Sequence, residues 1–190
     1  MPLCKSQTAL LTVPALRTFD FIKHNIMDTQ TASIRTVGLL TLFDYHTGFF
    51  PKVLDGLSEE DMHNRLSTEA NHPAWLAGSL VHQRFMMTSE TGSGLKETGE
   101  ELFKNYQGIQ AGVKYPTIAE YIADWKRISP EAREALVKMD DKKLDSEMDM
   151  AGTKMTYHEL ISFTIYREAN MIGQLALWRR LLGHPALKYD

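Results

Sequence analysis

The sequence predicts an all-α protein in which four long helices form a bundle. Four stretches of the chain repeat apolar residues every three or four positions, which is the spacing of one face of a helix. No stretch shows the sustained apolar–polar alternation that is typical of a half-buried strand. Two Thr-x-x-Glu sequences, at Thr117 and Thr156, match the capping box with which many helices begin. Long helices joined by short and long connections are typical of bundles.

The first predicted helix covers residues 33–57. Gly48 and Pro51 lie within it, and because proline lacks an N–H and clashes with the preceding turn, we expect a kink there. Residues 58–61 then predict a tight turn or the start of another helix. The apolar face of the first helix carries Leu39, Leu42, Phe43, His46, Phe49, Phe50 and Val53.

The second helix is expected to begin at Asn71-His72-Pro73, since proline is favoured in the first helical turn. Its pattern ends at the glycine-rich stretch 91–94. Residues 95–116 are irregular and form a long connection between the second and third helices, with one helical turn expected near 101–106. Long connections in compact domains are often functional or mobile.

The third helix is predicted to begin at Thr117, with Ser129-Pro130 marking either a kink or a new helix start. The charged residues 140–145 are interpreted as a solvated connection. The fourth helix begins at Thr156 and ends before Gly183 and Pro185, which together form a typical helix stop. Its predicted apolar face carries Leu160, Thr164, Arg167, Met171, Gln174, Leu175, Trp178 and Leu182.

The length of 190 residues suits one domain, which we place at residues 27–190. Residues 1–26 are predicted to form a poorly ordered extension, or to precede a true start at Met27. Their apolar run, 8–16, is too short to cross a bilayer and lacks the features of a secretory signal. We therefore expect no membrane partner.

Charge and cysteine content limit the possible partners and compartments. The formal net charge of -3 argues against a dedicated nucleic-acid-binding protein, which needs a basic face. Cys4 is the only cysteine, so the chain forms no internal disulfide and has no cysteine-based zinc site. These features predict a cytoplasmic protein.

Three sequence fragments, in order, resemble the DinB-like superfamily. The first is Asn71-His72-Pro73-Ala74-Trp75-Leu76-Ala77-Gly78-Ser79-Leu80, and the second is Glu101-Leu102-Phe103 followed by Tyr115-Pro116-Thr117. The third is Arg167-Glu168-Ala169-Asn170-Met171-Ile172-Gly173-Gln174-Leu175, which runs on to Arg179-Arg180-Leu181-Leu182-Gly183. The resemblance extends over roughly residues 34–185. It implies a DinB-like four-helix bundle, commonly dimeric, in which three histidines hold a divalent metal. Some members of this superfamily are metal-dependent thiol transferases or isomerases.

The three metal-ligand positions implied by the resemblance hold no histidine in this chain. They correspond to Ser79, Arg167 and Met171. Arginine is a permanent cation that cannot bind a metal, and serine and methionine are poor zinc ligands. We therefore predict no metal and no cofactor at these positions.

Arg167 lies on a predicted apolar face, so its charge needs a partner. Asp44, Glu168 or a bound anion would serve, and a structural ion pair or an outward-reaching side chain remains an alternative. His46 and His82 also lie on predicted inward faces. They would form an acid–base pair, a relocated metal site, or simply hydrogen-bonded packing residues.

These observations favour a protein without a metal that binds a small molecule, an anion among the candidates, or a degenerate relative of the metal-dependent thiol transferases. One alternative is an active transferase or hydrolase that uses a relocated metal or the His46/His82 pair. A second alternative is a structural or interaction protein that acts as a dimer, and a homodimer is expected in any of these cases. The residues predicted to line the binding site are His46, Ser79, His82, Arg167, Asn170, Met171 and Gln174.

Overall fold

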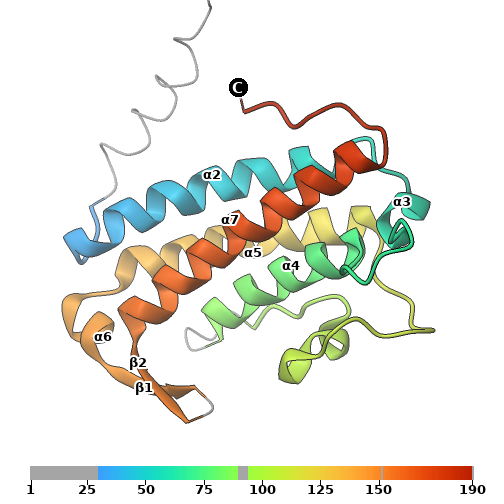
Figure 1. The fold of residues 1–190 in the computed structure, drawn as a ribbon. Coiled ribbons are helices and arrows are strands. Elements are labelled where there is room, and N and C mark those ends of the chain that lie inside the picture. Colours follow the sequence, from blue (N-terminus) through green and yellow to red (C-terminus); the bar gives the residue numbers. More distant parts are fainter. Residues whose placement is uncertain (1–29, 90–93, 151, 190) are drawn as a thin grey trace, which may run out of the picture. The chain divides into compact units, whose positions relative to one another are not determined.

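The computed structural model describes residues 30–89, 94–150 and 152–189, and within them the chain is mainly helical (Figure 1). The predicted extension 1–26 lies outside these residues. Among the helices described, none is long and apolar enough to cross a membrane. The prediction of a mainly helical fold is confirmed.

Four long helices account for most of the described chain (Figure 1). Each of them packs against two of the other three, in the cyclic order α2, α7, α4, α5. Three short helical segments, η1, η2 and η3, and two short helices, α3 and α6, complete the helical content. The bounds are η1 Ile34–Thr36, α2 Val37–Leu54, α3 Glu59–His63, α4 Pro73–Thr88, η2 Glu100–Leu102, η3 Lys104–Tyr106, α5 Ile118–Lys138, α6 Asp141–Asp145 and α7 Tyr157–Leu181.

The predicted helix starts are confirmed by their caps. The side chains of Thr117 and Thr156 each accept a hydrogen bond from the backbone N–H three residues later. In turn, the carboxylates of Glu120 and Glu159 accept the backbone N–H of Thr117 and Thr156. Helix α4 begins at Pro73, where the Nδ1 atom of His72 accepts the N–H of Trp75 at 3.1 Å. These bonds satisfy donors that the first turn of a helix otherwise leaves free.

Helices α2 and α5 continue through their prolines, so Ser129-Pro130 does not begin a new helix. Pro51 cannot donate to the carbonyl of Thr47, as a residue four positions later normally does. The indole Nε1 of Trp125 donates to this carbonyl instead, at 3.1 Å. A side chain of α5 thus satisfies the acceptor that the proline leaves open in α2.

Two predictions for residues 140–156 are wrong. Residues Asp141–Asp145 form helix α6, begun by the side chain of Asp140, where a solvated connection was expected. Strands β1 (Glu147–Met150) and β2 (Thr153–Thr156) form an antiparallel hairpin, although no strand was predicted. Each strand has only four residues, which is too short for alternation to stand out in sequence. Figure 1 shows the hairpin and α6 near the beginning of α7.

The buried apolar residues form two clusters, to which the long helices contribute most of the side chains. One contains Phe50, Leu80, Trp125 and Leu175, and the other contains Leu40, Phe43, Ala132, Leu136, Ile161 and Ile165. Part of the predicted buried face of α7 is confirmed, because Thr164, Met171, Leu175 and Trp178 are buried. The observed face is rotated from the predicted one toward Ile161, Ile165, Glu168 and Ile172, and Gln174 is exposed. This rotation determines which charged residue of α7 enters the core.

Candidate functional site

Arg167 joins α7 to α4 through uncharged partners. Its Nη2 donates to Ser79 Oγ and its Nη1 donates to Gln83 Oε1, both at 2.6 Å. Gln83 is itself held by a hydrogen bond from its Nε2 to the carbonyl of Thr164, at 3.0 Å. Ser79 and Gln83 lie one turn apart on α4, so the same face of the helix presents both oxygens to the guanidinium.

The Arg167 guanidinium has no carboxylate within ion-pair distance among the described residues, so neither Asp44 nor Glu168 is its ion-pair partner. Asp44 instead binds Arg133, at 2.8 Å. Burial lowers the pKa of Arg167, and the charge of the neighbouring Glu168 acts in the opposite direction without overcoming it. Arg167 is therefore a partly buried cation whose hydrogen bonds are made to neutral oxygens. Such an arrangement leaves its charge available for an anion.

The remaining candidates on α7 separate into two groups. Met171, one turn beyond Arg167, is buried at 5% exposure. Asn170 and Gln174 are exposed, and Gln174 Nε2 donates to Asn170 Oδ1 at 2.7 Å. The prediction that Gln174 faces the interior is wrong, because the buried face of α7 is rotated away from it.

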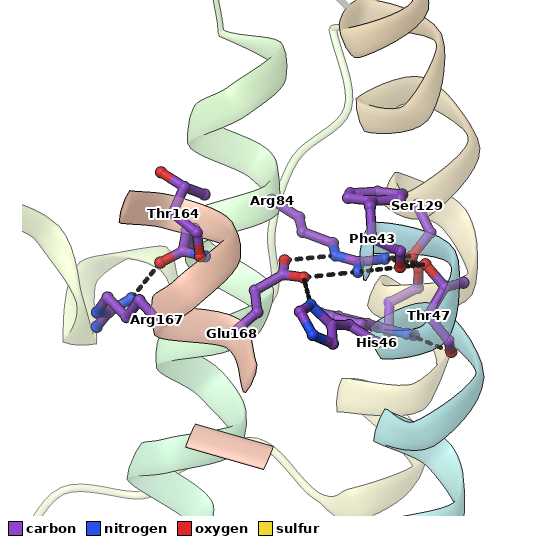
Figure 2. Close-up of polar contacts among 10 residues, drawn as sticks. Phe43, His46, Thr47, Arg84, Ser129, Thr164, Arg167 and Glu168 are labelled. Carbon is purple, nitrogen blue, oxygen red and sulfur yellow. Dashed lines mark hydrogen bonds and ion pairs between the residues drawn. The ribbon is translucent and has the colours of Figure 1, made fainter. Parts of the chain in front are cut away.

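A buried charge pair between α4 and α7 was not predicted from the sequence (Figure 2). Arg84 and Glu168 are both 0% exposed, with Arg84 Nε 2.8 Å from Glu168 Oε1 and Nη2 2.9 Å from Oε2. His46 Nδ1 lies 3.1 Å from the same carboxylate. Burial acts to raise the pKa of Glu168, but the charges and hydrogen bonds of Arg84 and His46 together hold that pKa below its usual value.

The surroundings of Arg84 complete its hydrogen bonds and cover its faces. Nη1 donates to Thr47 Oγ1 at 2.7 Å and to Ser129 Oγ at 2.6 Å. The guanidinium carbon lies 3.9 Å from the ring centre of Phe43 and 3.5 Å from that of Trp125. Because these two rings belong to different apolar clusters, the cation joins the two halves of the core. This geometry favours a structural role.

The sequence around each member of this pair carries a signal of its burial. Arg84 is the only Lys, Arg, Asp or Glu residue in α4, and it lies four residues after Leu80 and three after Val81. Glu168 lies three residues after Ile165 and four before Ile172, which is the spacing of a buried face. A helix with one charge in an apolar context predicts a paired charge in the core.

His46 and His82 are held by different carboxylates. His46 is buried and contacts Glu168, whereas His82 Nδ1 lies 2.7 Å from Glu97 Oε2. Glu97 comes from the connection between α4 and α5, and its side chain is 2% exposed. The two histidines therefore serve separate hydrogen-bonded groups, and the predicted His46/His82 pair gains no support.

Two buried polar atoms near His82 make no hydrogen bond within the described chain. They are Glu97 Oε1 and the hydroxyl of Tyr121. The Tyr121 hydroxyl lies beside Gly78, where a Cβ atom would approach it to 2.8 Å. Burial raises the pKa of both groups, and the hydrogen bond from His82 opposes this effect at Glu97. Buried polar atoms normally have a partner, so this part of the molecule suits a small polar molecule or water.

Within residues 30–89, 94–150 and 152–189, no three His, Cys, Asp or Glu side chains gather closely enough to hold a metal ion. No family model matches the chain, and no curated protein is significantly similar to it. The DinB-like resemblance therefore stays a prediction that depends on the sequence fragments quoted above.

Proposed function

We propose that the chain is a DinB-like four-helix bundle in which Arg167 takes the place of the metal and binds a small anionic molecule. Two of the three positions that the resemblance assigns to metal ligands, Ser79 and Arg167, are joined by a hydrogen bond of 2.6 Å. The third, Met171, lies one turn further along α7. The cyclic packing of α2, α7, α4 and α5 also supports this proposal.

The observation that carries the proposal is the contrast between two arginines. Arg84 is fully buried and donates to both oxygens of Glu168, so its charge is neutralised inside the protein. Arg167 is partly buried and makes its hydrogen bonds to a hydroxyl and an amide oxygen. A carboxylate or phosphate would supply the missing negative charge and match the planar fork of the guanidinium. Arg167 is thus the cation of the two that suits an external anion.

Binding of simple anions tests the proposal directly. Isothermal titration calorimetry would use inorganic phosphate and propionate as probes, with the wild type, Arg167→Gln and Arg133→Gln. Arg133 is the matched control, because this partly exposed arginine already binds Asp44. Loss of a charge-assisted hydrogen bond weakens binding by about tenfold or more. We expect this loss for Arg167→Gln and a change of less than about twofold for the control.

The outcome that would contradict the proposal is anion binding that is absent, or that does not depend on Arg167. Elemental mass spectrometry of the untagged protein, before and after incubation with zinc, nickel and manganese, is a second test. A stoichiometric metal would contradict the replacement of the metal by Arg167. It would instead revive the alternative of an enzyme with a relocated metal site.

A further inference from the structure

His82 is a histidine with one nitrogen held by a buried carboxylate and the other left without a partner in the described chain. Its Nδ1 lies 2.7 Å from Glu97 Oε2, and its side chain is 17% exposed. The ring also lies against Phe103, with ring centres 6.1 Å apart. No described residue forms a hydrogen bond with its Nε2. The ring is therefore fixed in orientation while one nitrogen remains available to a ligand.

The carboxylate determines which nitrogen carries the proton. An ionised carboxylate can only accept hydrogen bonds, so Nδ1 must be the donor toward Glu97. A neutral imidazole with a proton on Nδ1 has a lone pair on Nε2, which is then an acceptor. Burial raises the pKa of Glu97, but the hydrogen bond and charge of His82 oppose this effect. With the Glu97 carboxylate accepting from Nδ1, Nε2 is the acceptor that faces a ligand.

His82 lies beside the arginine site on the same helix. Ser79, which accepts from Arg167, precedes His82 by three residues on α4. Residues three apart on a helix have Cβ atoms about 5–6 Å apart, so their side chains are neighbours. A molecule bound to Arg167 at Ser79 would therefore lie beside the His82 side chain.

We propose that His82 Nε2 accepts a hydrogen bond from the ligand that Arg167 holds, so that the site selects small carboxylates carrying a hydroxyl on the second or third carbon. This inference rests on the proposed function. An ammonium group at the same place would be repelled by the Arg167 guanidinium, whereas a hydroxyl carries no charge. Glu97 is then a positioning residue that acts through the orientation of His82.

The first experiment tests the tautomer of His82 without any ligand. Two-bond nitrogen–proton correlation spectra of ¹⁵N-labelled protein at pH 8, assigned with His82→Gln, report which nitrogen carries the proton. We expect the proton on Nδ1 in the wild type and loss of this fixed tautomer in Glu97→Gln. A proton found on Nε2 in the wild type would overturn the inference, because that nitrogen would then be a donor.

The second experiment measures selectivity between paired probes. The dissociation constants of propionate, lactate and 3-hydroxypropionate would be compared in the wild type, His82→Phe and His82→Gln. One neutral hydrogen bond corresponds to about fivefold in affinity, so at least one hydroxylated probe should bind about fivefold more tightly than propionate. His82→Phe should abolish this ratio, and His82→Gln, which offers an oxygen near the position of Nε2, should restore part of it.

The results separate failure of this inference from failure of the proposed function. Propionate binding that depends on Arg167, with no preference for either hydroxylated probe in the wild type, would overturn the role of His82 alone. A preference that persists in His82→Phe would do the same. Absence of any Arg167-dependent binding would overturn the proposed function, and the selectivity inference with it.

Discussion

The buried pair of Arg84 and Glu168 predicts an unusual order of stabilities among three variants. Arg84→Met and Glu168→Leu each remove one charge and leave the other in a site that is 0% exposed. An unpaired buried charge of this kind costs about 3–5 kcal/mol. The double variant removes both charges, so it should lose less stability than either single variant.

The hydrogen bonds around the pair set the expected loss of the double variant. Ser129 Oγ still donates to the carbonyl of Trp125, and Thr47 Oγ1 still donates to that of Phe43. His46 loses its acceptor, and a buried polar group without its partner costs about 1–3 kcal/mol. The methionine side chain that replaces Arg84 would retain apolar contact with the two rings that cover the guanidinium. We therefore expect the double variant to lose about 1–3 kcal/mol.

Urea denaturation followed by circular dichroism at pH 7.5 measures these differences. The control pair is Asp44 and Arg133, which is partly exposed and should lose less than about 1 kcal/mol when either member is neutralised. Domains of this size have about 5–15 kcal/mol of stability, so a single variant that fails to fold while the double variant folds also meets the prediction. Single losses below about 1 kcal/mol, or a double loss equal to their sum, would refute the reasoning.

Three further predictions concern the ends and contacts of α4 and α7. Burial lowers the pKa of His72 from 6.5 to about 4, so the folded state loses up to about 3 kcal/mol of stability as pH falls through this interval. Urea unfolding at pH 7.5 and 4.5 should therefore show a smaller loss of stability in His72→Asn, which keeps a capping acceptor, than in the wild type. An equal loss in the two proteins would contradict this prediction. Gly78→Ala places a Cβ against the ring of Phe103 and should cost about 1–3 kcal/mol despite the better helix propensity of alanine, whereas Gly173→Ala, which meets no atom within 4 Å, should not destabilise. Thr156→Ala removes the cap of α7 and should lower the free energy of unfolding by about 1 kcal/mol, while Thr156→Ser should restore most of it; equal stability of all three proteins would contradict the capping role.

The helices could be predicted from the sequence because their signals are local. Pro73 at the start of α4, the capping boxes at Thr117 and Thr156, and the glycine stop at Gly183 depend only on neighbouring residues. Their positions agree with the structure to within a few residues. The hairpin at residues 147–156 was missed, because four-residue strands carry too little periodicity to be distinguished from a loop.

The candidate site could be predicted only in part. Ser79 and Arg167 were expected to lie together, and a hydrogen bond joins them in the structure. Gln83, the second partner of Arg167, and Glu97, the partner of His82, were not predicted. Gln83 is one position along α4 from His82, but Glu97 lies in a long connection whose path no local pattern predicts.

The sequence by itself determined where the four long helices lie, where they begin, and that no histidine occupies the metal-ligand positions that the resemblance implies. Only the tertiary structure decided which of two adjacent residues on α7 enters the core. Adjacent residues on a helix point about 100° apart, so a rotation of the buried face brings Glu168 into the core in place of Arg167. Packing against α4 settled the choice: Glu168 faces the buried Arg84, and Arg167 is left at the edge with neutral partners.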